Sequence, residues 1–450
     1  MQTFQPDTLD PTTDVIPSGR RLTDFRAWVA RHFTPDTSFM IMAFFTGLAA
    51  GLAAGLLKDG IGFMADCANR ISVMAGAGRI ALFVAPIIGI MATGAYMRYV
   101  LRRNIEHGSG HLVNNIAAGK VNLSPKLMIA PIVGASLTLG FGGSAGSEGP
   151  IAYAGSAIGS NIGRYMGLDS KRTALLLAIG AGAGIAGIFK SPVGGTFYAL
   201  EVMGMQMGTA AVIALFVACL TASLTAYVAS GCTVDLPFSG IEHFELNAIP
   251  AAMVLGVVCG LFSLFYRWQQ RTTARHITAV SRPWLRNLIA GTSLGVLIFI
   301  FPSLYGEGYG AAGEVINGHP FGLLHGSLLP YHWGIWGLVA ATACILAVKA
   351  AAVALTNSGG GIAGDFAPTL FAGAVLGCLF GTVGGMLPVG ELPTHNLAYC
   401  AMAGAMAGII RAPLMAIFLV VEMCAGYALL LPVTITALIS YVIVKVLSPK

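Results

Sequence analysis

The sequence predicts an all-α protein that crosses the membrane many times, and its composition supports this directly. Of the 450 residues, 56% are hydrophobic and only 10% are charged, and the mean hydropathy is +0.77. A soluble domain carries about 25% charged residues. This chain therefore has too few polar groups to cover a surface that faces water, which excludes the soluble globular, disordered and disulfide-framework classes.

Glycine usage is the second observation behind this prediction. Glycine accounts for 59 of the 450 residues, about twice the typical share of about 7%. The glycines lie inside apolar segments, often four residues apart, a spacing that lets membrane helices approach closely.

Charge and cysteine usage narrow the function classes further. The net charge of +6 comes mainly from Lys and Arg in the loops, as the positive-inside rule requires, and is not clustered as a nucleic-acid footprint would be. The eight cysteines are scattered without CxxC spacing, and the histidines show no HExxH pattern. We therefore expect no metal, no cofactor and no nucleic-acid partner.

The order of elements follows from the apolar runs. Residues 1–36 are polar and arginine-bearing, without the pattern of a signal peptide, and predict a cytoplasmic N-terminal segment. Apolar segments follow at 37–57, 80–101, 126–141, 151–167, 173–189, 192–230, 247–266, 286–301, 333–356, 366–388, 396–424 and 427–447. Several are shorter than the about 20 residues needed to cross the hydrocarbon core. They predict broken helices that end inside the membrane around a site.

An internal repeat divides the membrane domain into 37–230 and 231–450. Residues 142–163 and 360–381 are identical at 9 of 22 positions at an offset of 218, through six glycines, two alanines and a proline. A second block, GIFKSP at 187–192 followed by Phe and Glu, matches residues 408–413 and their downstream Phe and Glu at an offset of 221. Two related halves are typical of transporters, whose site lies near the repeat interface.

The segment GSEGP at 146–150 describes the start of a helix, because glycines and an early proline are typical of one. Free N–H groups and the helix dipole at such an N-terminus bind an anion without any formal positive charge. Glu148 lies at this N-terminus, and a carboxylate inside a membrane protein is a functional candidate. The alternative is that Glu148 only caps the helix.

The second half offers the equivalent helix start, GDFAP at 364–368, where Phe366 takes the position of Glu148. One half thus carries an ionisable group and the other an apolar wall. A third glycine-broken segment, 108–110, contains Ser109, whose hydroxyl can donate a hydrogen bond. Converging neutral donors of this kind suit anion turnover, because an ion held by a full charge would leave slowly.

These motifs, in this order, resemble the CLC family of chloride channels and chloride/proton antiporters. The motifs are GSG at 108–110, GSEGP at 146–150, GIFKSP at 187–192 and GDFAP at 364–368. The resemblance covers about residues 37–447. It implies a CLC-type inverted repeat of about 18 helices, many of them short or broken, in a homodimer with one anion pathway per subunit.

The resemblance also implies roles for single residues. Glu148 would be the gating glutamate, which blocks the path when deprotonated and swings away to admit chloride when protonated. Ser109 would donate to the central chloride, and backbone N–H groups near the two helix starts would complete the sites. The residues expected to bind the anion are Ser109, Gly146, Ser147, Gly149, Phe366 and Ala367.

Four departures from the family pattern stand out. Ser147 replaces the Lys or Arg common before the gating glutamate, which predicts weaker electrostatics at the outer site. His111 begins a His-Leu pair where an aliphatic-Pro pair is usual. The internal proton-handling glutamate of many antiporters would fall at Val202, so Glu201 or water would have to serve an internal proton path. The family's pore tyrosine would lie beyond Lys450, so we expect the natural chain to continue.

The sequence therefore predicts chloride transport in a bacterial-type inner (plasma) membrane, by chloride/proton exchange gated by Glu148. The alternative, favoured by Val202, is a passive chloride channel gated by voltage or pH. The expected partners are small anions, protons, the bilayer and a second copy of the chain. An intramembrane enzyme would need a nucleophile–base pair that the sequence lacks. A cation transporter would want several intramembrane carboxylates, for which the candidates are Glu148, Glu201, Asp365 and Glu422.

Overall fold

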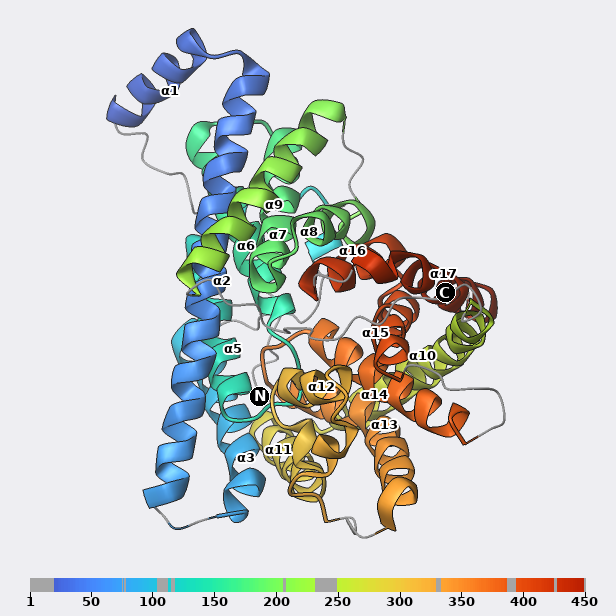
Figure 1. Cartoon of the computed structure of the whole chain (residues 1–450). Helices are drawn as coiled ribbons and strands as arrows, with labels where there is room; N and C mark the ends of the chain where they lie inside the picture. The colour runs from blue at the N-terminus through green and yellow to red at the C-terminus, as the bar shows by residue number, and fades with distance from the viewer. Residues whose placement is uncertain are drawn as a thin grey trace.

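The computed structural model describes residues 20–74, 76, 78–102, 112–114, 118–204, 208–230, 249–328, 333–386, 394–424 and 427–448. Within this part the first half forms α1 (Arg20–His32), α2 (Pro35–Met74), α3 (Ile80–Ala95), α5 (Ala130–Gly140), α6 (Glu148–Met166), α7 (Ser170–Phe189), α8 (Pro192–Phe197) and α9 (Thr209–Ala229). The second half forms α10 (Ile249–Thr278), α11 (Pro283–Ile300), α12 (Tyr309–Ile316), α13 (Gly334–Ser358), α14 (Phe366–Gly384), α15 (Thr394–Ile410), α16 (Pro413–Met423) and α17 (Leu430–Leu447). Figure 1 shows the blue-to-green helices of the first half beside the yellow-to-red helices of the second.

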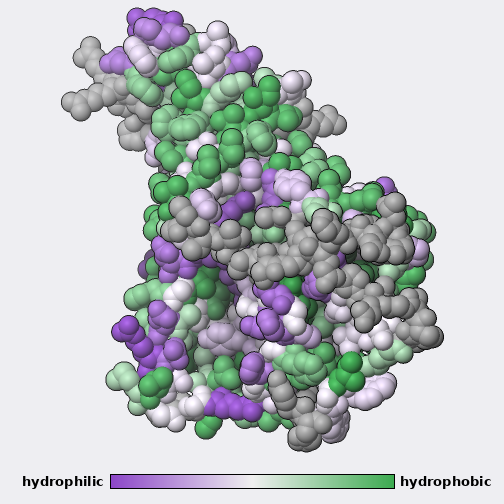
Figure 2. Space-filling view, viewed as in Figure 1, coloured by the Kyte–Doolittle hydropathy of each residue, from purple (hydrophilic) through white to green (hydrophobic). Residues whose placement is uncertain are grey.

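The helices confirm the predicted class of membrane protein. In the described residues, nine helical segments are long and apolar enough to cross a membrane by length and composition. Large hydrophobic side chains on their outer faces are exposed, including Leu56, Leu224 and Leu261. Figure 2 shows hydrophilic side chains gathered over α1 and hydrophobic ones over the flank below it. Such a surface is stable only when lipid covers it.

Helix breaks are present at equivalent places in the two halves, and the sequence predicted the first of them. Helix α7 ends before Lys190, whose φ is 54°, and the six-residue helix α8 begins at Pro192. Helix α15 likewise ends before Arg411, whose φ is 67°, and α16 begins at Pro413. The apolar run 396–424, expected as one segment, is therefore two helices, because a left-handed residue followed by proline cannot continue a helix.

Close glycine contacts join consecutive helices, as the four-residue spacing predicts. On α6, a Cβ at Gly155 would collide with the backbone carbonyl of Gly180 on α7. On α14, a Cβ at Gly373 would collide with the carbonyl of Ala401 on α15. Each pair packs backbone against backbone, which is how membrane helices associate without a hydrophobic driving force.

Helices α6 and α14 have the positions that the repeat assigns to them. Both contain 19 residues, and they begin at Glu148 and Phe366. Their N-termini lie inside the protein, because both first residues are buried. The two helix starts predicted from glycine and proline are therefore real, and they bring two sets of free N–H groups into the protein interior.

Candidate functional site

The loops that precede α6 and α14 are joined to each other through their backbones. The N–H of Gly146 donates to the carbonyl of Gly364 at 2.9 Å, and the N–H of Gly364 donates to the carbonyl of Gly146 at 2.6 Å. These residues are equivalent in the repeat, since 146 plus 218 is 364. This reciprocal bridge brings the N-terminus of each helix to the same place.

A second reciprocal pair fixes the same two loops. The N–H of Ile362 donates to the hydroxyl of Thr138 at 2.9 Å, and the N–H of Ser144 donates to the hydroxyl of Thr356 at 3.1 Å. Both threonines are fully buried, at the C-terminal ends of α5 and α13. Each half thus supplies the acceptor for a buried N–H of the other half, which would otherwise be costly to leave unpaired.

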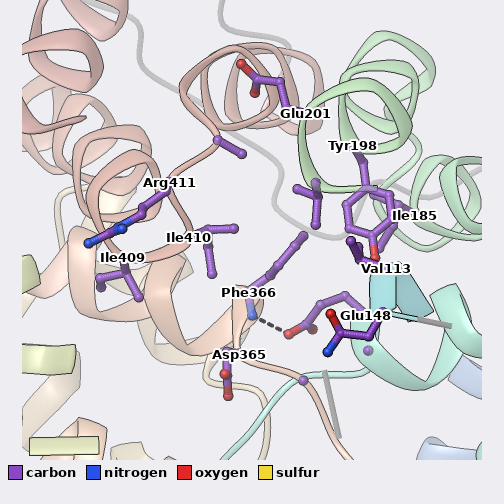
Figure 3. A pocket seen from close by; sticks show the side chains of 15 residues that line it. Val113, Glu148, Ile185, Tyr198, Glu201, Asp365, Phe366, Ile409, Ile410 and Arg411 are labelled. Atoms are coloured by element: carbon purple, nitrogen blue, oxygen red, sulfur yellow. Dashed lines mark hydrogen bonds between the residues drawn. The ribbon is translucent and has the colours of Figure 1, made fainter. Parts of the chain in front are cut away.

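Glu148 lies at the centre of this arrangement and is 1% exposed. Its Oε1 accepts a hydrogen bond from the N–H of Phe366, the dashed line in Figure 3. Its buried Oε2 has no hydrogen-bond partner among the described residues. A Cβ on Gly146 or Gly364 would collide with this carboxylate as it lies here, and at Gly364 it would also collide with the backbone nitrogen of Gly149. The carboxylate occupies the N-terminus of α14, the kind of position predicted for an anion.

A cavity of about 600 Å³ extends from Glu148. Its wall includes Tyr198, Glu201, Val202 and Arg411, which come from both halves of the chain. Figure 3 shows Glu148 and Glu201 on opposite sides of this space. The predicted gating residue and the predicted internal proton-path residues therefore share one cavity.

Two aromatic rings line the cavity. The ring of Tyr198 packs edge-on against the ring of Phe366, with centroids 5.8 Å apart. Figure 3 shows both side chains between Glu148 and Glu201. Both aromatic side chains therefore belong to the wall of the cavity that Glu148 and Glu201 border.

Glu201 and its repeat counterpart Glu422 bind the helix starts of opposite halves. Glu201 accepts from the N–H groups of Leu414 and Met415 at 3.2 and 2.8 Å, at the N-terminus of α16. Glu422 accepts from two N–H groups at the N-terminus of α8, at 2.9 and 3.0 Å, and from the hydroxyl of Ser191 at 2.7 Å. A carboxylate at a helix N-terminus is stabilising. This reciprocity explains why the repeat keeps a glutamate at both places.

The residue before Glu148 has a partner that sequence reasoning missed. Ser147 donates from its backbone N–H and from its hydroxyl to Oε1 of Glu307, at 3.0 and 2.5 Å. Oε2 of Glu307 accepts from Nζ of Lys58 at 3.2 Å. Glu307 belongs to a turn 160 residues further along the chain, so no local pattern could have indicated it.

A buried lysine was also missed. Lys349 on α13 is fully buried, and its Nζ donates to the hydroxyl of Ser144 at 2.9 Å. The same ammonium lies 4.6 Å from the ring centroid of Phe371. Within the described residues it forms no ion pair. A lone lysine in an apolar run was visible in the sequence and could have been singled out.

The predicted site residues divide into two groups. The structure brings together the segments 146–149 and 366–367, with Glu201 and Val202 across the cavity. Ser109 and His111 lie outside the described residues. In the part of the chain that the structure describes, no three His, Cys, Asp or Glu side chains group as metal ligands would.

The comparison with protein families agrees with this geometry. The family model described as voltage gated chloride channel matches residues 88–445. The chain belongs to this family, the CLC family. The match covers both helix starts, the reciprocal loops and the cavity.

Curated relatives of the CLC family resemble most of the chain. A putative chloride channel protein ClcB-like from Ralstonia nicotianae (strain ATCC BAA-1114 / GMI1000) is 28% identical over 371 residues, or 80% of this chain and 82% of the relative. An H(+)/Cl(-) exchange transporter ClcA from Vibrio campbellii (strain ATCC BAA-1116) is 25% identical over 438 residues, 93% of this chain and 89% of the relative.

Solved CLC structures share the fold. A slow cyanobacterial Cl-/H+ antiporter matches with a TM-score of 0.77 and 23% identity, covering 93% of this chain and 96% of its own. A CLC-type fluoride/proton antiporter matches with a TM-score of 0.72 and 23% identity, over 91% and 95% of the two chains. The expected CLC-type architecture is thereby confirmed.

Proposed function

We propose that this protein carries chloride across a membrane in exchange for protons, with Glu148 as the group that binds the proton and competes with chloride for one position. The observation that carries the proposal is the hydrogen bond from the N–H of Phe366 to the Glu148 carboxylate. A carboxylate that fills a helix N-terminus stands where a halide would bind. The named exchange activity of ClcA relatives supports the same function.

The mechanism follows from competition for one position. Deprotonated, Glu148 is held at the N-terminus of α14 and closes the path. Protonated, it loses its charge and most of its attraction to the N–H groups, so it leaves and chloride takes its place. Because the deprotonated carboxylate and chloride exclude each other from this position, protonation of Glu148 and binding of chloride are coupled.

The donors for the anion would come from several elements. We assign the backbone N–H groups near Gly149, Phe366 and Ala367, the N–H and hydroxyl of Ser147, and the hydroxyl of Ser109. These neutral donors would bind chloride without trapping it. The N–H of Gly146, which the sequence also suggested, already donates to the carbonyl of Gly364.

The inner part of the proton path would run through the cavity. Glu201 would form its inner end, and water would carry the proton past Val202, which cannot relay one. Glu201 borders the cavity, whereas Glu422 is not among its lining residues.

We further propose the assembly and location. Segments 37–230 and 231–450 would form two inverted halves, and residues 1–36 would be cytoplasmic. The chain would work as a homodimer in a bacterial plasma membrane, as a transporter rather than an enzyme.

Proteoliposomes test the function directly. The full chain is reconstituted with a chloride gradient, and external chloride and pH are followed together. We expect chloride efflux to drive protons uphill. Chloride movement without protons would contradict exchange and establish the passive channel that Val202 favours. Flux of fluoride without chloride would contradict the assigned anion, and flux that persists with impermeant anions on both sides would indicate a cation carrier.

A further inference from the structure

A network of three side chains lies directly before the helix that carries Glu148. Glu307 accepts two hydrogen bonds from Ser147 with one oxygen and a charged hydrogen bond from Lys58 with the other. In the described residues this Lys58–Glu307 contact is the one ion pair. Its side chains are 27% and 11% exposed, so the network lies at the edge of the buried site.

The backbone conformation of a tight turn places Glu307 beside Ser147. Glu307 lies between Gly306 and Gly308, whose φ angles are 68° and 87°. Left-handed conformations are costly for residues with a Cβ, so the two glycines shape a turn that few other residues would allow. The Lys58 ammonium is also 4.7 Å from the ring centroid of Tyr309, which follows in α12. The carboxylate is therefore placed by a turn on one side and a cation on the other.

The donor groups of Ser147 that Glu307 occupies lie at the start of helix α6. The N–H of Ser147 lies at the N-terminus of α6, where the helix dipole favours an anion. Glu307 fills that donor, while Glu148 fills the N-terminus of α14. Protein carboxylates thus occupy both helix starts in this state.

We infer that Glu307 is a positioning residue of the anion path, a second carboxylate that chloride must displace from Ser147 before it reaches Glu148. This inference rests on the proposed chloride transport. Glu307 can leave Ser147 while keeping its ion pair, because a different oxygen binds Lys58. Lys58 thereby supplies the positive charge that Ser147 lacks, and its ammonium favours chloride at the vacated donors.

Chloride affinity tests this, because the two charges act in opposite directions. Calorimetry on the purified full chain measures chloride binding to wild type, Glu307→Gln and Lys58→Met. We expect Glu307→Gln to bind chloride about fivefold more tightly and Lys58→Met about fivefold more weakly, as one unit charge a few ångströms away would cause. The matched control is Glu314→Gln, which neutralises an exposed carboxylate on the neighbouring α12 and should change nothing.

A purely structural role would not give opposite signs. Shifts in the same direction, or no shift in either variant, would overturn the inference. As a second measurement, crystals of Glu307→Ala soaked in bromide should show stronger anomalous density beside the N–H of Ser147 than wild-type crystals soaked in the same way. Equal density in the two would also overturn the inference. A wild-type protein that neither binds nor carries chloride would overturn the proposed function itself, whereas a working wild type with unshifted variants overturns this inference alone.

Discussion

Glu148 and Phe366 are 218 residues apart, and the N–H of Phe366 donates a hydrogen bond to the Glu148 carboxylate. The same offset separates Gly146 from Gly364, whose backbones form the bridge between the loops. The proposed gating position is thus built from equivalent residues of the two halves. The side chains at the two equivalent positions differ, so the ionisable Glu148 of one half faces the backbone N–H of Phe366 in the other.

The reciprocal threonines should stabilise the two loops equally. Thr138→Val and Thr356→Val keep the side-chain shape but leave a buried N–H unpaired. We expect each to lower the free energy of unfolding by about 1–3 kcal/mol, measured by thermal unfolding in detergent. Thr46→Val is the control, because its buried hydroxyl donates to a carbonyl of its own helix and accepts no N–H in the described structure. Equal losses in all three variants would contradict the cross-repeat role.

Substitutions of Glu201 and Glu422 should have the same effect on stability but different effects on proton transport. Glu201→Gln and Glu422→Gln each weaken the binding of a helix N-terminus, and we expect both to cost about 1–2 kcal/mol of stability. Glu201 also borders the cavity, so Glu201→Gln should lower the number of protons moved per chloride. Glu422→Gln should leave that ratio unchanged. Unaltered coupling in both would remove Glu201 from the proton path.

Close packing of α6 on α7 should not tolerate a methyl group. Gly155→Ala places its Cβ against the carbonyl of Gly180. We expect this to lower the free energy of unfolding by about 1–3 kcal/mol, measured by thermal unfolding in detergent. Gly62→Ala on α2 is the matched control, because nothing lies within 4 Å of its added Cβ. That variant should be neutral, or more stable by up to about 1 kcal/mol. Similar behaviour of the two variants would contradict the packing argument.

Replacing Lys349 should raise the stability of the protein and weaken its binding of chloride. Lys349→Met removes a buried ammonium without an ion pair in the described residues, and we expect unfolding to become harder by on the order of 1 kcal/mol. The same change removes a positive charge bonded to Ser144, in the loop that precedes Glu148. Chloride binding measured by calorimetry should therefore weaken. A destabilised variant with unchanged binding would make Lys349 a structural anchor only.

The sequence indicated the features that depend on local backbone chemistry. Glycine and proline marked the starts of α6 and α14, whereas the break before Pro413 was not expected within the apolar run 396–424. It did not indicate Glu307, because its contact with Ser147 joins segments 160 residues apart. It also did not indicate that Glu201 binds the start of α16, since a side-chain partner in another repeat leaves no periodic pattern. Ser109 stays a prediction outside the described residues.

The most direct test of the central claim is paired chloride and proton flux in Glu148→Ala. This variant vacates the N-terminus of α14 and removes the titratable group that contests it with chloride. We expect chloride flux to persist while chloride-driven proton movement disappears, against a wild type that shows both. Proton movement that continues undiminished in Glu148→Ala would contradict the claim that Glu148 couples the two ions.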